Sequence, residues 1–302
     1  MSTPPAGTTN KRIFSQNDYL APLPIPTGVK PQDVLNTIWS KNDVFLDIGS
    51  YSIGSAVMVI WPTALLFALL SYITPDPLIW GGGLIIVGIP ILILIQGLFR
   101  DVPLPIRFNR QRREVCVPRE GGDYWIVPWE SVTAAATQQS SVSQAGKATM
   151  GLLIIGFENP DQQAKEENKH FSLGFNCGGG TTAMALWECT RSYMEIGPDA
   201  VPDSRVGIAP YEETQIGSII TDLRKGDLLN ALWGIFCITI LGTYLAEKLQ
   251  DLKLSHPPEL TDPTIVEWSK PLPPEQWAKR SPELEAAIAK REAELERNEQ
   301  AA

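Results

Sequence analysis

Two neighbouring apolar stretches decide the fold of this chain: GSAVMVIWPTALLFALLSYIT at residues 54–74 and LIWGGGLIIVGIPILILIQGLF at residues 78–99. No charged residue stands in the 28 positions between Asp47 and Asp76, or in the 23 positions between Asp76 and Arg100. A helix needs about 20 apolar residues to cross the hydrocarbon core of a bilayer. Each stretch therefore predicts a transmembrane helix, and together they predict a hairpin. The alternative is a buried helical hairpin in a globular core, although both runs exceed the usual length of core helices.

The basic residues around the hairpin predict its orientation. The connection at residues 75–77 carries no lysine or arginine, whereas Lys30 and Lys41 precede the first stretch and Arg100 follows the second. Further arginines follow soon after Arg100. The positive-inside rule therefore places both outer flanks of the hairpin in the cytoplasm.

A third uncharged stretch, LLNALWGIFCITILGTYLA, covers 19 residues at positions 228–246. This length just suffices for a third transmembrane helix. If it spans, the tail that follows lies outside the cytoplasm. If the stretch lies along the membrane interface or packs on the hairpin, the tail stays inside. We expect the span, and hence a tail outside the cytoplasm.

Average composition hides these stretches. The 302 residues are 44% hydrophobic with a net charge of −9, and the mean hydropathy of −0.04 is typical of a soluble protein. The neutrality arises because apolar stretches are offset by polar, proline-rich flanks. A purely soluble enzyme is excluded, and the acidic balance argues against nucleic acid as a partner. The four cysteines show no metal-binding or disulfide spacing.

The region between the second and third apolar stretches predicts a small α+β domain. Short extended runs lie at residues 102–108, 114–118, 124–132, 151–157 and 170–175. A helix with one apolar stripe follows the glycines at 178–180. We therefore expect an α+β membrane protein in which a small antiparallel sheet is capped by an amphipathic helix. The element order is similar to that of a pleckstrin-homology-like (PH-like) domain placed after a membrane hairpin.

The two ends of the chain are expected to be extended. The proline-dotted N-terminal region predicts disorder over most of its length, and the proline-rich tail ends in a charged helix after Ser281 that is either solvent-exposed or weakly partner-binding. Trp268 and Trp277 in this tail either anchor a partner or pack back on their own protein. The expected division is 1–50 N-terminal region, 51–99 hairpin, 100–225 cytoplasmic domain, 226–248 third helix and 249–302 tail.

Few residues suggest catalysis. The only histidines, His170 and His256, lie on opposite membrane faces if the third stretch crosses. Cys177 lacks the motif of a nucleophile, and the glycines that follow it lack the lysine of a phosphate-binding loop. We therefore expect no enzyme activity, no catalytic residue, no cofactor and no metal.

A basic cluster follows the second apolar stretch. Juxtamembrane cations gain about 1 kcal/mol each near anionic lipid. The cluster either docks the domain on anionic lipid headgroups or only sets the topology. It comprises Arg107, Arg110, Arg112, Arg113 and Arg119.

Three motifs carry a resemblance to a known family. They are IRFNRQRREVCVPREGG at 106–122, VPWESV at 127–132 and ALWECTRSYMEIGPDAVP at 185–202. With the apolar segments, they resemble an uncharacterised family of proteobacterial inner-membrane proteins associated with type VI secretion effector clusters. The resemblance covers about residues 50–250, and Cys116 stands where the family pattern has an aromatic residue.

The resemblance implies a multi-pass protein of the bacterial inner membrane, so that a tail outside the cytoplasm is a periplasmic tail. It also implies an immunity protein that binds a type VI secretion effector, so the expected partner is an effector toxin or a secretion component. The alternatives are an accessory or scaffold protein for effector loading, or a lipid- or stress-sensing regulator.

Overall fold

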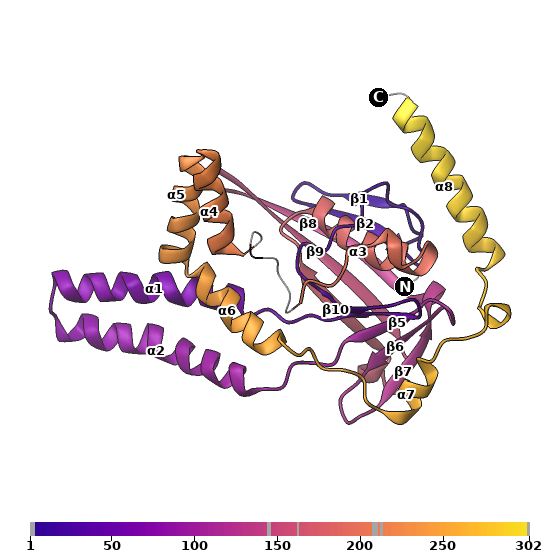
Figure 1. Ribbon diagram of the computed structural model, residues 1–302, viewed down its shortest axis with the longest axis horizontal. Helices are drawn as coiled ribbons and strands as arrows, with labels where there is room; N and C mark the ends of the chain where they lie inside the picture. Colours follow the sequence, from indigo (N-terminus) through magenta and orange to yellow (C-terminus); the bar gives the residue numbers. More distant parts are fainter. Residues whose placement is uncertain (1–3, 144–145, 162, 207–210, 212–213, 301–302) are drawn as a thin grey trace. The chain divides into compact units, whose positions relative to one another are not determined.

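The computed structural model describes residues 4–143, 146–161, 163–206, 211 and 214–300 (Figure 1). The chain divides into two compact units. We call residues 51–103 and 205–258 the helical unit, and residues 1–50, 104–204 and 259–302 the sheet unit. Both units are discontinuous in sequence, so the chain leaves the sheet unit twice and returns to it twice.

The first two helices of the helical unit form the expected hairpin. Helix α1 covers Gly54–Ile73 and helix α2 covers Pro77–Phe99. Asp76 caps α2 by accepting a hydrogen bond from the Leu78 backbone N–H at 2.8 Å. Both helices are long and apolar enough to cross a membrane. Their apolar side chains are mostly exposed, as helices that face lipid require.

The third apolar stretch differs from the expected straight helix. Helix α4 (Gln215–Lys225) precedes α5 (Leu228–Phe236), which continues as a π-helical turn at Cys237–Leu241. The helix then bends by 70° into α6 (Thr243–Leu254). Gly242 makes the bend because it adopts a left-handed conformation with φ of 69°, which glycine tolerates without steric cost. Residues 205–225 also belong to the helical unit and not to the middle domain.

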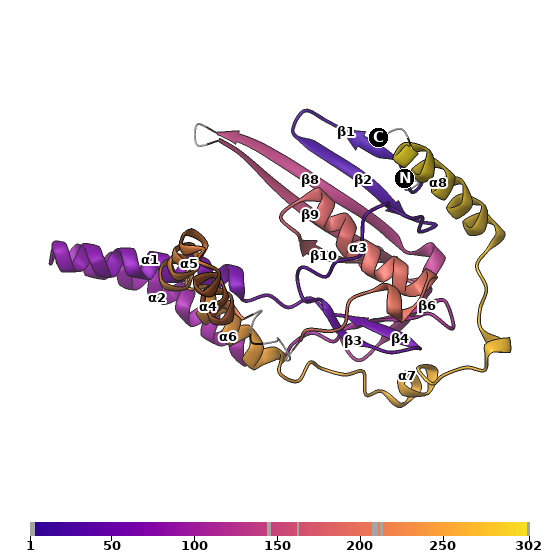
Figure 2. The same cartoon turned by 45° about the horizontal axis from the view of Figure 1, so that its top comes forward.

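The sheet unit contains two antiparallel sheets of five strands each, ordered β1-β2-β8-β9-β10 and β3-β4-β5-β6-β7 (Figure 2). Helix α3 (Gly180–Glu195) packs against β8 and β9. The expected sheet-and-helix class is confirmed, with two sheets in place of one small sheet. The strands are β1 Thr9–Lys11, β2 Ser15–Ala21, β3 Ile38–Lys41, β4 Phe45–Ile48, β5 Ile106–Asn109, β6 Glu114–Pro118, β7 Tyr124–Pro128, β8 Thr133–Ser143, β9 Gly146–Glu158 and β10 His170–Asn176.

One hydrophobic core joins both sheets and α3. Phe108 of β5 lies edge-on to Trp129, with ring centroids 5.9 Å apart, and Trp129 stacks on Trp187 of α3 at 5.5 Å. Phe157 of β9 also contacts Phe108. All four rings are almost completely buried. Buried aromatic side chains remove a large apolar area from water, which stabilises the unit.

The expectation of a mostly disordered N-terminal region is corrected by the structure. The first 50 residues contribute β1 to β4, two strands to each sheet. Leu20, Ile38 and Leu46 from this region are buried in the common core. The prolines between these strands suit connecting loops and do not prevent strand formation.

The expectation of an extended tail is also corrected by the structure. Helices α7 (Pro263–Trp268) and α8 (Pro282–Gln300) fold into the sheet unit. Leu284 and Ile288 of α8 are buried, so its thin apolar line packs on the same protein, while most of its other side chains are exposed.

Candidate interaction site

A buried carboxylate at the end of α3 joins four segments of the sheet unit. The Glu195 side chain is only 1% exposed. It accepts hydrogen bonds from Arg113 Nη2 at 2.8 Å, Trp129 Nε1 at 2.7 Å and Arg280 Nε at 2.6 Å. Arg113 also reaches Glu130 at 3.1 Å. Charge-assisted hydrogen bonds of this kind are stronger than neutral ones, so Glu195 fixes these four segments to one another.

Glu195 therefore connects the three motifs that carry the resemblance. Arg113 comes from the first motif, Trp129 from the second and Glu195 itself from the third. Glu195 cannot be recognised from the sequence, because a single glutamate in an amphipathic helix gives no periodic or motif signal. Its positively charged partners, Arg113 and Arg280, lie close to it only in the folded chain, where the four segments come together.

The surroundings of Glu195 set its pKa. Burial alone would raise the pKa of this carboxyl, but the hydrogen bonds from Arg113 and Trp129 and the positive charges of Arg113 and Arg280 lower it below its ordinary value of 4.5. The carboxylate form is therefore the form that the folded unit stabilises.

A second buried ion pair lies on the β3–β7 sheet. Arg107 of β5 donates to both carboxylate oxygens of Asp47 in β4, each at 2.7 Å. The two side chains are 7% and 3% exposed. The Arg107 guanidinium also lies 3.6 Å from the centre of the Phe45 ring. Its remaining Nη1 donates to Ser269 Oγ at 2.9 Å, so the pair also holds the C-terminal tail.

The turn between β5 and β6 binds the tail through its backbone. We call residues 259–281 the tail strap. Arg112 Nε donates to the Trp268 carbonyl oxygen at 2.8 Å. Gln111 accepts from the Leu272 N–H at 2.7 Å through its side chain and from the Ala278 N–H at 2.8 Å through its carbonyl. Contacts to backbone groups hold a chain segment without depending on its side chains.

Apolar contacts and one tryptophan add side-chain recognition to the tail strap. Leu260 and Ile265 pack on Cys116 of β6 in a small buried cluster that also includes the Trp268 ring. Trp268 Nε1 donates to Glu114 Oε2 at 2.8 Å. The strap is thus held by backbone, apolar and ionic contacts along its whole length.

The arginines predicted to contact lipid have protein partners. Arg107 and Arg113 are withdrawn into the two buried clusters, so these two side chains are not available to headgroups. Arg110 lies 5.5 Å from the Trp277 ring. Arg119 lies between the Trp125 and Phe171 rings at 4.6 and 4.5 Å. The cluster builds the sheet unit and its tail contacts, which corrects the docking role for Arg107 and Arg113.

The two tryptophans differ in burial. Trp268 is engaged with β6, as described above. Trp277 donates through Nε1 to the Leu272 carbonyl at 2.9 Å but keeps 38% of its surface exposed. The sequence leaves open whether these tryptophans anchor a partner or pack on their own protein. In the structure both contact their own chain.

The remaining titratable candidates lie apart. His170 is exposed on the sheet unit and His256 is exposed on the helical unit. Burial raises the pKa of the Cys177 thiol, which makes it a poor nucleophile. Within the described part of the chain, no group of three or more His, Cys, Asp or Glu side chains could hold a metal ion.

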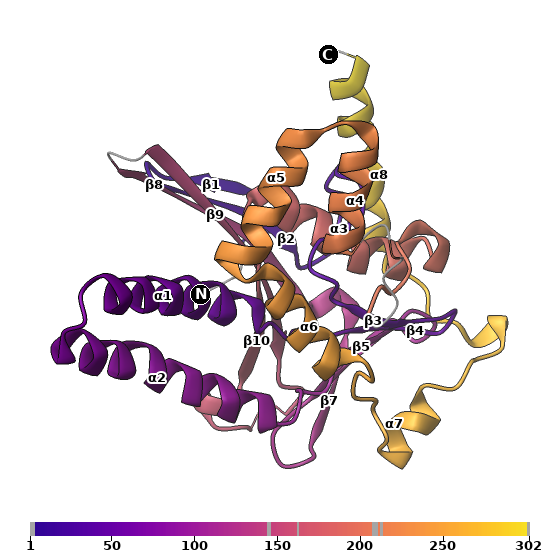
Figure 3. The ribbon, with the colours of Figure 1, turned by 60° about the vertical axis from the view of Figure 1, so that its left-hand side comes forward.

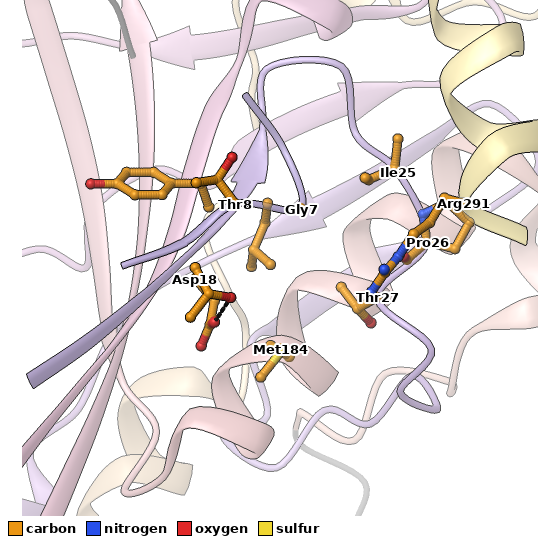
Figure 4. A pocket seen from close by; sticks show the side chains of 11 residues that line it. Gly7, Thr8, Asp18, Ile25, Pro26, Thr27, Met184 and Arg291 are labelled. Atoms are coloured by element: carbon orange, nitrogen blue, oxygen red, sulfur yellow. Dashed lines mark hydrogen bonds between the residues drawn. The ribbon is translucent and has the colours of Figure 1, made fainter. Parts of the chain in front are cut away.

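A small pocket lies where α8 meets the N-terminal strands. It has a volume of about 70 Å³. Its wall includes Asp18, Met184 and Arg291 (Figure 4). Arg291 donates to the Pro26 carbonyl at 3.2 Å, and Asp18 accepts from Thr9 Oγ1 at 2.6 Å. Both polar groups form hydrogen bonds within the protein itself. The pocket is therefore a gap in the packing between α8 and the N-terminal region.

Comparisons with family models, with curated proteins and with solved structures found no match to this chain.

Replacing Trp268 with alanine is expected to loosen the tail strap. The change removes the hydrogen bond to Glu114 and the ring contact with the Leu260–Ile265 cluster. Because proteolysis follows the population of locally opened chain, cleavage within residues 259–281 should accelerate at least tenfold, which corresponds to about 1.4 kcal/mol. Limited proteolysis followed by mass spectrometry measures this rate. Trp277→Ala is the matched control and should change the rate much less, and equal rates for both variants would contradict the assignment.

Proposed function

We propose that this chain is a membrane-anchored immunity protein that protects against a type VI secretion effector by binding it, without catalysis. One observation carries the proposal: a polar surface of the sheet unit, built from β5, β6 and their connecting turn, holds a long segment with little regular structure, the tail strap. Side chains of β5, β6 and their connecting turn are aimed at the backbone and side chains of that segment. A surface built in this way suits the binding of a protein partner.

The proposed location is the bacterial inner membrane. The α1–α2 hairpin crosses the bilayer twice, and the sheet unit lies in the cytoplasm together with the N-terminal region and the tail. The positive-inside distribution of lysine and arginine supports this orientation, and the packing of the tail in the sheet unit supports its placement there. The effector would then be met on the cytoplasmic side.

A protection assay tests the proposal. The full chain is expressed in sensitive cells that also produce the effector encoded beside it, and survival is compared with cells that carry an empty vector or an unrelated effector. We expect survival to be restored for the neighbouring effector alone, with secretion unchanged. Loss of secretion on deletion of the gene, without self-intoxication, would instead support an accessory protein that loads or positions the effector. Failure of both results would overturn the immunity proposal.

A further inference from the structure

We propose that α4, α5 and α6 form a lipid-binding surface that lies in the plane of the membrane interface and does not cross the bilayer. We call residues 215–254 the interfacial segment. This inference rests on the proposed crossing of the α1–α2 hairpin, and it concerns a different part of the chain from the tail strap. Its partner is the lipid surface itself.

Chain connectivity gives the first argument. Residues 205–258 belong to the helical unit, and the residues on either side of them, Ser204 and Glu259, belong to the sheet unit. Two ends of one compact unit lie on the same side of a membrane. The chain between them must therefore cross the bilayer an even number of times. Residues 205–258 contain a single long apolar stretch, which could cross only once. An even number of crossings therefore means that this stretch does not cross at all.

The length of the apolar helix gives the second argument. The run Leu228–Leu241 precedes the 70° bend. At 1.5 Å per residue it rises about 21 Å, which is shorter than the hydrocarbon core of about 30 Å. Beyond the bend, α6 carries four charged side chains that cannot continue through the core. They are Glu247, Lys248, Asp251 and Lys253.

Contacts within the helical unit show which residues of α1 lie beside each part of the interfacial segment. Trp61 Nε1 donates to the Thr239 carbonyl at 2.9 Å, just before the bend. The Ala246 methyl group lies beside Gly54 at the start of α1. Gly54 and Trp61 are about 10 Å apart along the helix axis. Helix α6 therefore rises from this depth toward the surface where the hairpin begins.

The end of α6 confirms this direction. Lys253 Nζ donates to the Arg100 carbonyl at 2.9 Å, at the end of α2. Helix α5 runs across the direction of α1, with α4 at its side (Figures 1 and 3). If α1 stands along the membrane normal, α5 therefore lies in the plane. Amphipathic interfacial helices lie at this depth, with their apolar face about 5–10 Å into the boundary region.

The surface of α4 and α5 has the chemistry of an interfacial helix pair. Arg224 and Lys225 stand at the turn between the helices, where long cationic side chains can extend to anionic headgroups. Most apolar side chains of α5 are exposed, as are those of the hairpin in the same unit. The exposed ones of α5 are Leu228, Leu229, Leu232, Trp233, Ile235 and Phe236.

The bend is built into the packing of the unit. A Cβ atom at Gly242 would lie 2.7 Å from the Trp61 ring, and the residue has positive φ. A straight helix through this position would lose the close contact with α1 and the left-handed turn. The glycine thus holds α5 away from the direction that a transmembrane helix would take.

Depth measurements in the full chain test the inference. Cys237 is replaced by serine, and spin labels are attached at Leu229→Cys, Leu232→Cys or Phe236→Cys in vesicles containing anionic lipid. The other three native cysteines are buried and stay unlabelled. We expect the three labels to lie at similar depths, within about 5 Å of one another, because the helix is in the plane. A transmembrane α5 would instead place the first and last labels about 10 Å apart in depth.

A label at Ile86→Cys in α2 and a reporter fused at residue 302 complete the test. The α2 label should be deep in the bilayer and the reporter should show cytoplasmic activity. A steady depth gradient along α5, or a periplasmic reporter, would overturn the in-plane arrangement. A water-exposed label at Ile86 would overturn the membrane hairpin itself, which is a failure of the proposed anchor and is distinguishable from the first. Neither result depends on the immunity assay.

Discussion

Replacing Glu195 with alanine is expected to lower the free energy of unfolding of the sheet unit by about 3–5 kcal/mol, the usual cost of removing one partner of a buried ion pair. The change leaves the buried Arg113 guanidinium with Glu130 as its remaining carboxylate partner and leaves the Trp129 N–H without an acceptor. The desolvation cost of both groups is then less well compensated. Denaturant unfolding of the full chain in detergent, followed by tryptophan fluorescence, measures the loss. The exposed pair of Glu166 and Lys169 supplies the control, because Glu166→Ala should leave the free energy of unfolding nearly unchanged.

The pH dependence of stability separates the charge of Glu195 from its shape. A carboxyl whose pKa is lowered on folding contributes stability at pH values above its unfolded pKa, and this contribution is lost as the pH falls through the folded pKa. The wild-type protein should therefore lose stability below about pH 4.5. Glu195→Gln keeps the shape but cannot titrate, so its stability should fall less over the same range. Parallel curves for the two proteins would show that the charge is unimportant.

Replacing Asp47 with alanine is expected to have a similarly large effect, about 3–5 kcal/mol, because the Arg107 guanidinium would remain buried without its partner. It should also loosen the tail strap, since Arg107 holds Ser269. The measurements are the unfolding free energy and the rate of cleavage within residues 259–281. A smaller loss than that of an exposed pair would contradict the assignment of this ion pair.

A double-mutant cycle separates the pair from its surroundings. Replacing both partners, Asp47→Ala with Arg107→Met, removes the two charges together, and apolar replacement of a buried ion pair is often close to neutral. We therefore expect the double variant to be more stable than Asp47→Ala alone. Additive losses would show that the two residues do not act as a pair.

Local sequence predicted the elements whose signals are local. The helices of the hairpin follow from long uncharged runs, and α3 follows from its apolar stripe and from the glycines before it. The helix after Ser281 follows from its cap and Pro282. The short strands β5, β6 and β10 follow from apolar runs bounded by turn residues. Each of these signals lies within about 20 residues of sequence.

The candidate site is harder to predict from local sequence because it is assembled from distant segments. From the sequence, Arg107 and Arg113 are interpreted as juxtamembrane cations. Their ion-pair partners, Asp47 and Glu195, are far away in the sequence, so no local pattern predicts these pairs. From the sequence, Trp268 is interpreted as an anchor for an outside partner or for the protein itself. Its contact partner Glu114 lies more than 150 residues away in the sequence. Pairing at that separation leaves no periodic trace in the chain.

Residues 54–99 and 228–246 by themselves determined that the protein has membrane-compatible helices, because hydrophobicity and length are properties of a contiguous run. The tertiary structure decided where the rest of the chain belongs. It placed the N-terminal strands and the tail in one unit with the middle domain, and it broke the third apolar run at Gly242. The physical reason is that packing, ion pairing and chain connectivity join residues far apart in sequence. A count of apolar residues contains none of those interactions.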